Sequence, residues 1–119
     1  MTKRELLQRT KDFALRVVRA VQALPRGDTT SILGRQLLRS GTSVGANYRA
    51  ACRAKSGADF LNKLKIVEEE CDESLYWMEL LVDSGLMPLR RLQALMREGD
   101  ELLSITVSAI KTTRATRSA

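Results

Sequence analysis

Residues 39–51, RSGTSVGANYRAA, decide the fold of this chain. The stretch holds two glycines, two serines, a threonine and an asparagine, which lose backbone entropy in a helix or offer competing side-chain hydrogen bonds. Its composition therefore suggests a loop, but its spacing predicts one helix that crosses it without a break. Apolar and small residues recur through it in alternating steps of four and three, at Leu33, Leu37, Ser40, Val44, Asn47, Ala51 and Ala54.

Gly41 and Gly45 lie one helical turn apart, a G-x-x-x-G spacing that lets the backbone of another helix approach closely. Each glycine costs about 1 kcal/mol relative to alanine inside a helix, so close packing must offset that cost. A phosphate-binding loop would instead need a G-K-S or G-K-T ending after a strand, which is missing here. We therefore assign Gly41, Ser43, Gly45 and Asn47 to helix packing, with Asn47 fixing the register through a buried hydrogen bond rather than binding a ligand.

Helical periodicity divides the whole chain into four segments, separated by breakers at residues 25–28, 56–57 and 84–85. The predicted helices span residues 3–24, 30–55, 58–83 and 88–113, and residues 114–119 form a polar tail. Thr29, Thr30 and Ser31 are the candidates for capping the second helix. Short connections imply antiparallel neighbours, so residues 1–119 are predicted to form a single all-α domain, an antiparallel up-down-up-down four-helix bundle about 30 Å long.

Composition excludes several classes of protein. The 119 residues suffice for one buried core without a metal or a disulfide, and five aromatic residues disfavour a sheet-rich fold. No window of 18 apolar residues is free of charge, so we expect no membrane span. Cys52 and Cys71 are the only cysteines, and the charged N-terminal sequence does not resemble a signal peptide. We therefore expect a cytoplasmic protein with reduced thiols.

No residue pattern points to an enzyme. Histidine is absent, which removes the commonest general base and the commonest transition-metal ligand. Glu70 and Glu73 stand at i, i+3 on one helix, but the Glu-x-x-His motif of di-iron bundles is missing. Ser40, Thr42 and Ser43 have no base in a nucleophilic arrangement. We expect no catalytic residue, metal or cofactor, and we place Glu70 and Glu73 at packing or interface positions.

Charge is distributed unevenly along the chain, whose net charge is +6. Residues 1–55 carry twelve basic and three acidic side chains, residues 56–86 carry two and eight, and residues 87–119 carry six and three. Such a basic first half permits a polyanionic partner. The candidates for contacting RNA or DNA are the arginine stripe of the second helix together with two arginines of the first: Arg35, Arg39, Arg49, Arg53, Arg16 and Arg19.

A row of arginines can bind phosphates and displace their condensed counterions, so its affinity falls steeply with salt. The alternative is that these arginines are solvated, or pair with the acidic third helix of the same or a neighbouring subunit. Trp77 with Tyr76 likewise permits two interpretations. The pair could stack on bases, but an aromatic residue in a leucine-rich helix is more typical of a core or an interface, where we place Trp77.

Two central stretches, QLLRSGTSVGANYRAACRAKSGADF (36–60) and KIVEEECDESLYWMELL (65–81), resemble the signature of the four-helix-bundle family encoded in intervening sequences of bacterial 23S rRNA genes. This family is also labelled as S23 ribosomal proteins, after the place of its founding genes. Residues 13–27 and 101–114 extend the likeness to nearly the whole chain. The chain also resembles, more loosely and in fold and charge only, the accessory variability proteins of diversity-generating retroelements, which bind nucleic acid and act with a reverse transcriptase.

The resemblance implies a small bundle assembled into a ring-shaped homopentamer with no catalytic residues. It assigns structural or interface positions to nine residues of this sequence, namely Gln36, Arg39, Ser43, Asn47, Asp59, Phe60, Glu70, Glu73 and Trp77. We therefore expect a non-enzymatic, self-associating protein that binds RNA or DNA through a basic surface of its first two helices. The alternative is an adaptor for another protein, for example a reverse transcriptase, with no nucleic-acid contact. Self-association fits the charge pattern, because the acidic third helix of one subunit could face a basic helix of the next.

Overall fold

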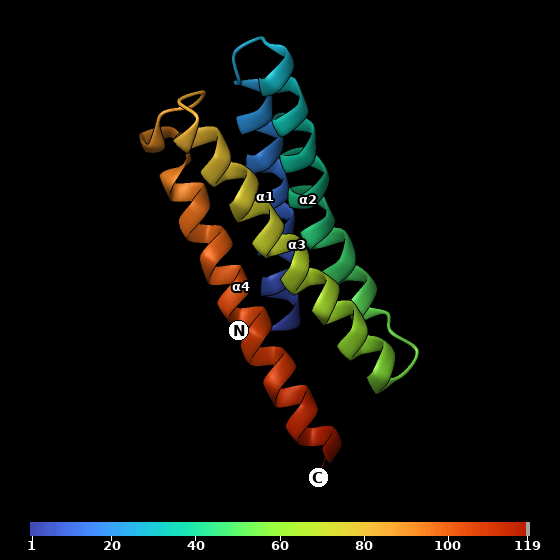
Figure 1. Ribbon diagram of the computed structural model, residues 1–119. Helices are drawn as coiled ribbons and strands as arrows, with labels where there is room; N and C mark the ends of the chain where they lie inside the picture. The colour runs from blue at the N-terminus through green and yellow to red at the C-terminus, as the bar shows by residue number, and fades with distance from the viewer. Residues whose placement is uncertain (119) are drawn as a thin grey trace.

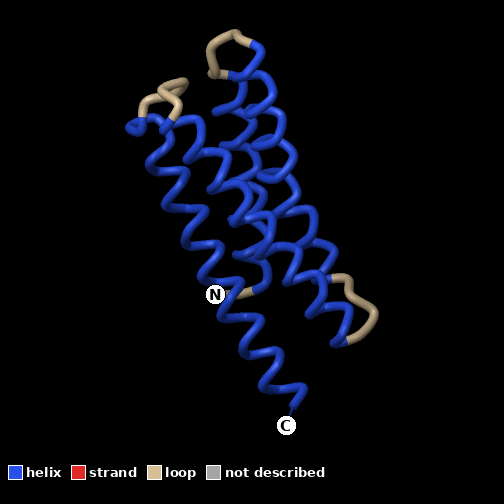
Figure 2. The backbone as a smooth tube through the Cα atoms, viewed as in Figure 1, coloured by secondary structure: helices blue, strands red, loops and turns tan. Residues whose placement is uncertain are grey.

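The computed structural model describes residues 1–118, which form four α-helices joined by short loops (Figure 1). The helices are α1 (Lys3–Gln22), α2 (Asp28–Cys52), α3 (Gly57–Asp83) and α4 (Leu89–Ser118). The three loops lie at alternating ends of the molecule, so successive helices run in opposite directions (Figure 2). The predicted all-α four-helix bundle is confirmed. Its longest dimension is 51 Å, which exceeds the expected length because α4 contains 30 residues.

Each helix packs against its neighbours in the chain, and α4 closes the bundle against α1 through a smaller contact. Within the described residues, no Cα atom of α1 lies within 8 Å of one in α3, and the same holds for α2 and α4, so these pairs lie diagonally across the bundle. Helix α2 therefore forms one corner, with α1 on one side and α3 on the other. No helix within residues 1–118 combines the length and apolar character that crossing a bilayer requires.

The chain is helical throughout residues 39–51 and packs the glycines of this stretch against α1. A Cβ atom at Gly41 would lie 2.7 Å from both γ-carbons of Val17, and one at Gly45 would lie 3.2 Å from the carbonyl oxygen of Thr10. Val17 and Thr10 are themselves buried. This close approach of two helices is what the G-x-x-x-G spacing predicts.

The adjoining side of α2 faces the core and α3. Leu37, Val44 and Ala51 are buried there, and the hydroxyl of Ser74 donates a 3.1 Å hydrogen bond to the buried hydroxyl of Ser40. Tyr48 is also buried, whereas the neighbouring Asn47 is only half-buried. The apolar stripes of the other helices supply the rest of the core, including Leu6, Phe13, Leu64, Val67, Cys71, Leu75, Met78, Leu92, Leu95, Leu102 and Ile110.

The observed helix ends correct several details of the sequence prediction, and α1 ends at Gln22 rather than at 24. Helix α2 begins at Asp28, and its N-cap is Gly27, which has a φ of 155°. Thr29, Thr30 and Ser31, the predicted capping residues, therefore lie inside the helix. It ends at Cys52 rather than at 55.

Residues 114–118, predicted as a tail, continue α4, and Ala119 lies outside the described residues. Thr113 and Thr116 donate hydrogen bonds to carbonyls four residues earlier, and Arg114 and Arg117 bring positive charge to the negative end of the helix dipole.

Candidate nucleic-acid interface

A groove of about 660 Å³ lies between the first half of α1 and the last half of α2. Lys3, Arg4 and Lys11 line it from α1, and Arg49 of α2 and Arg53, directly after the end of α2, line it from the other side. Among the described residues that line it, none carries a carboxylate or an aromatic ring. The groove therefore gathers five positive charges around one concave surface, with no negative charge in its lining.

The helix-packing glycines explain why the groove forms at this place. Gly45 and Ala46 of α2 line it together with Ala14 of α1, so its walls contain small side chains. Because the helices are antiparallel and Thr10 lies against Gly45, the beginning of α1 lies beside the end of α2. This pairing brings the cations of the two helix segments to the same surface.

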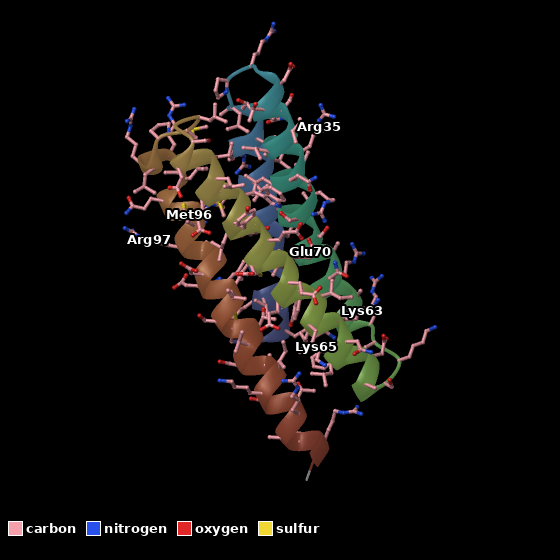
Figure 3. The ribbon with its side chains drawn as sticks, in the orientation of Figure 1. Arg35, Lys63, Lys65, Glu70, Met96 and Arg97 are labelled. Atoms are coloured by element: carbon pink, nitrogen blue, oxygen red, sulfur yellow. The ribbon has the colours of Figure 1, made fainter. Side chains whose placement is uncertain are left out.

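A second groove of about 720 Å³ lies on the other side of α2, toward the beginning of α3. It shares Arg49 and Arg53 with the first groove and adds Lys55 and Lys63. Its one acidic residue, Asp59, accepts a hydrogen bond of 3.2 Å from the backbone N–H of Lys55 through its carboxylate. Figure 3 shows Lys63 in the half of α3 that is nearer the α2–α3 loop.

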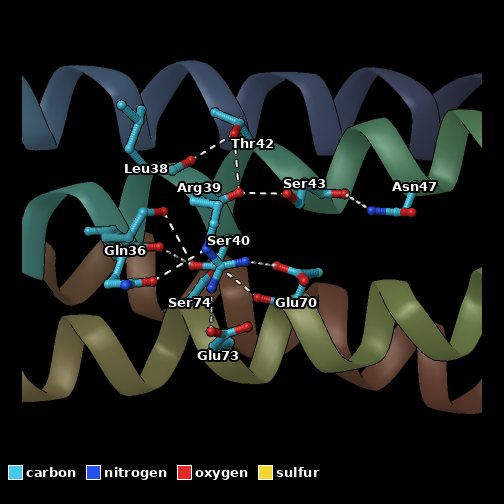
Figure 4. A network of polar contacts seen from close by, with 11 residues as sticks. Gln36, Leu38, Arg39, Ser40, Thr42, Ser43, Asn47, Glu70, Glu73 and Ser74 are labelled. Carbon is cyan, nitrogen blue, oxygen red and sulfur yellow. Dashed lines mark hydrogen bonds and ion pairs between the residues drawn. The ribbon is translucent and has the colours of Figure 1, made fainter.

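Arg39 differs from the other arginines of its stripe because carboxylates of α3 hold it (Figure 4). Its Nη2 donates to Glu73 Oε1, its Nη1 lies 3.6 Å from Glu70 Oε2, and its Nε donates to Gln36 Oε1 at 3.3 Å. For Arg39, the structure therefore shows the alternative that the sequence left open, pairing with the acidic third helix. Burial and the charge of Glu73 raise the pKa of Glu70 despite this pairing.

The remaining candidates lie away from the two grooves. Arg35 is exposed toward the opposite end of α2 (Figure 3). Arg16 and Arg19 line a separate groove of about 430 Å³ beside α4, where Asp12 and Glu98 are also present. Only two of the six predicted residues, Arg49 and Arg53, therefore line the two cationic grooves.

Comparison with known proteins places the chain in a family. A model of the 23S rRNA-intervening sequence protein family matches residues 2–108. The chain belongs to this family. A solved structure from Bacteroides thetaiotaomicron, described as a protein with unknown function from the S23 ribosomal protein family, is 35% identical in sequence. The likeness covers 89% of this chain and 98% of that chain, with a TM-score of 0.84. No curated protein matches the chain.

In this intervening-sequence family protein, Asn47 does not make the buried, register-fixing hydrogen bond that its position on the stripe predicted. Its Nδ2 donates to the carbonyl of Ser43 at 2.9 Å, and the hydroxyl of Ser43 donates to the carbonyl of Arg39 at 2.6 Å. Both bonds stay within α2 (Figure 4). The buried polar contact between helices is instead the one that joins Ser40 to Ser74.

Trp77 packs partly buried against the core and meets Tyr76 edge-to-face, with ring centroids 5.1 Å apart and planes at 68°. Its indole Nε1 is buried and has no hydrogen-bond partner among residues 1–118. Tyr76 is 52% exposed. Neither aromatic residue lines the two cationic grooves, so the structure separates the predicted aromatic pair from the cations.

Sequence reasoning missed five cations of these grooves, namely Lys3, Arg4, Lys11, Lys55 and Lys63. A signal for the first three was available. In an antiparallel hairpin the start of the first helix must lie beside the end of the second, so cations at both places share one surface. Lys55 lies in the α2–α3 loop and Lys63 follows in α3, so the stripe of a single helix includes neither of them.

The two cysteines of this family member differ in their accessibility. Cys52 is half-buried and lines the first groove, whereas Cys71 is fully buried in the core. Burial, together with the neighbouring carboxylates, raises the pKa of Cys71 to about 12. A thiol reagent should therefore react with Cys52 first, which makes that residue a reporter of the first groove.

Proposed function

We propose that this member of the 23S rRNA-intervening sequence protein family is a non-enzymatic protein that binds RNA or DNA through its two cationic grooves. The observation that carries the proposal is the first groove, where five cations converge without a carboxylate. Each cation that neutralises a phosphate releases condensed counterions, and this release is a large source of affinity for nucleic acids. Arg39 is not included, because α3 already neutralises it.

The spread of the cations favours a polymer over a small phosphate compound. Lys3 and Lys11 are eight residues apart on α1, which corresponds to about 12 Å along a helix. A single phosphate group cannot contact both ends of such a row, whereas a phosphodiester chain offers one charge after another. The repeated charge of the ligand therefore matches the repeated charge of the site.

We also propose that the protein self-associates, and a pentameric ring is the assembly that the family resemblance implies. The exposed side of α3 carries Glu69, Asp72, Glu79 and Asp83, with Tyr76 among them. Its charge is negative, so α3 of one subunit can face a basic helix of the next, while the positive charge of the grooves remains for the nucleic acid. Light scattering at micromolar concentration tests this, and a monomeric mass would contradict it.

Charge reversal tests the nucleic-acid proposal. We expect Arg49→Glu with Arg53→Glu to weaken binding of labelled RNA and DNA at least tenfold in fluorescence anisotropy. The slope of log affinity against log salt should become flatter by roughly 1.5 to 2, because two phosphate contacts are lost.

The matched control is Arg35→Glu with Arg97→Glu, which changes the net charge equally at exposed positions outside the grooves. An equal loss in both variants would mean that net charge alone attracts the ligand. Affinity that is independent of salt would also contradict the proposal, and absence of binding would favour the protein-adaptor alternative.

A further inference from the structure

We infer that the nucleic acid bound by this protein is a duplex, whose two strands lie in the two grooves on either side of Arg49 and Arg53. The inference rests on the proposed function and makes it more specific. Three observations carry it: the corner position of α2, the sharing of Arg49 and Arg53 by both grooves, and the absence of aromatic side chains among the described residues of both linings.

The corner position makes the end of α2 a ridge between two concave surfaces. The backbones of α1 and α3 both pack against that of α2 but do not approach each other closely. Ala46, Arg49 and Arg53 belong to both grooves, so this segment of α2 separates them. We call it the arginine ridge. A ridge with a cationic groove on each side matches a ligand that has two phosphate strands with a groove between them.

The dimensions agree with this arrangement. A helix with its side chains is about 10–12 Å across, and the major groove of B-form DNA is about 12 Å wide. Packed helices have axes about 8–10 Å apart, which places the cations of α1 and of α3 at the flanks of the ridge. One strand would meet Lys3, Arg4 and Lys11, and the other would meet Lys55 and Lys63.

The chemistry of the linings disfavours an unpaired strand. Proteins that hold single strands stack successive bases on aromatic rings, and each stack contributes about 1–3 kcal/mol. The described residues that line the two grooves include no Phe, Tyr or Trp. Tyr76, the exposed ring of α3, is thirteen residues from Lys63, or about 20 Å along the helix. The lack of aromatic rings does not weaken the binding of a duplex, because the bases of a duplex stay paired and stacked on one another.

The first test compares a 20-base-pair DNA duplex, an RNA duplex of the same sequence and the corresponding single strands, each titrated with the full chain. We expect at least one duplex to bind at least tenfold more tightly than its single strands. The two duplexes are separate arms that show whether B-form or A-form geometry is preferred. A single strand that binds as tightly as both duplexes overturns the inference but leaves the proposed function standing.

The second test asks whether both grooves are used at once. One double variant, Arg4→Glu with Lys11→Glu, changes only the first groove, and another, Lys55→Glu with Lys63→Glu, changes only the second. Each should weaken duplex binding about tenfold and flatten its salt slope by roughly 1.5 to 2. A loss confined to one of the two variants overturns the inference. Tyr76→Ala is the matching aromatic control, and a large loss in that variant would indicate base stacking instead.

The third test needs no substitution, because Cys52 reports on the first groove. We expect saturating duplex to slow alkylation of Cys52 by iodoacetamide several-fold in the native protein, as followed by mass spectrometry. Binding without protection of Cys52 would place the ligand elsewhere and overturn the inference. If neither duplex nor single strand binds at any salt concentration, the proposed function itself fails, which is a distinct outcome.

Discussion

Arg39 and Arg49 lie on the same outward stripe of α2, yet their electrostatic surroundings are opposite. Arg39 is held by Glu70 and Glu73 from the middle of α3. Arg49 stands on the arginine ridge, where the adjoining segments of α1 and α3 contribute Lys3, Arg4, Lys11 and Lys63. The difference arises from the neighbouring helices, because α3 carries two lysines and one carboxylate, Asp59, near its beginning and several carboxylates in its middle. A row of arginines on one helix therefore becomes a binding surface only where the adjoining helices leave its charge uncompensated.

The largest effect should come from disrupting the close contact between α1 and α2 at Gly41. We expect Gly41→Leu to lower the free energy of unfolding by about 3 kcal/mol or more, since even a Cβ there lies 2.7 Å from Val17 in the core. Urea unfolding followed by circular dichroism measures this. Ala94→Leu, at an exposed position of α4, is the control and should change stability by less than about 0.5 kcal/mol. Equal stability of the two variants would contradict the tight seam.

A smaller effect concerns Arg9, a second arginine held by carboxylates, which joins α1 to α4. Its Nη2 donates to Glu98 Oε1 at 2.6 Å and to Glu101 Oε2 at 3.0 Å. The hydrogen bond from Arg9 lowers the pKa of Glu98 below its ordinary value of 4.5. Stability from this pair is thus fully present above pH 4.5 and is lost as the pH falls through the lower folded-state pKa.

We expect Glu98→Gln to cost about 1 kcal/mol at pH 7, with the difference from the wild type vanishing in acid. Chemical unfolding at several pH values measures both results. A difference that persists below the folded-state pKa would show that the loss is steric rather than electrostatic.

Glu70 should show the opposite sign, because burial and Glu73 raise its pKa. Its charge then lowers stability, and this destabilisation appears as the pH rises above the ordinary glutamate value and is complete above the folded-state pKa. We expect Glu70→Gln to stabilise the fold by less than about 1 kcal/mol at pH 7 and to match the wild type in acid. Thermal unfolding at pH 3 and pH 7 tests this. A clear loss of stability at pH 7 would mean that the pairing with Arg39 outweighs the cost of burial.

The smallest effect should come from removing the carboxylate charges that neutralise Arg39, which would leave Arg39 as uncompensated as Arg49. Glu70→Gln with Glu73→Gln releases Arg39 from both carboxylates, so affinity for nucleic acid should rise about threefold, with a salt slope steeper by roughly 1. Glu69→Gln with Asp72→Asn makes the same change in net charge at exposed positions and is the control. Equal gains in the two variants would attribute the effect to net charge alone.

How far the sequence predicts this structure depends on whether a feature belongs to one helix or to several. Leu37, Val44 and the seam glycines follow from the periodicity of α2 by itself. Tyr48 is buried in the core where Asn47 was predicted, because a straight helix drifts about 20° per heptad away from a strict seven-residue repeat.

The site was less predictable because it depends on how three helices are placed along one another. Whether Arg39 or Arg49 meets a carboxylate is set by the offset between α2 and α3, which one stripe does not contain. Lys3 and Lys11 are remote from Arg49 in sequence and lie beside it only because Thr10 packs against Gly45. Helix type follows from local spacing, whereas the sharing of charge between helices follows from their register.

The arrangement of the chain ends has a practical consequence for handling the protein. Lys3 and Arg4 line the first groove directly after the N-terminus, and the side chain of Arg117, near the C-terminus, lies against Gly57 beside the second groove. An affinity tag or fluorescent protein fused to either end would therefore stand next to the arginine ridge and compete with any ligand. Binding measurements should use protein from which such fusions have been cleaved, with probes attached to the distant α1–α2 or α3–α4 loop.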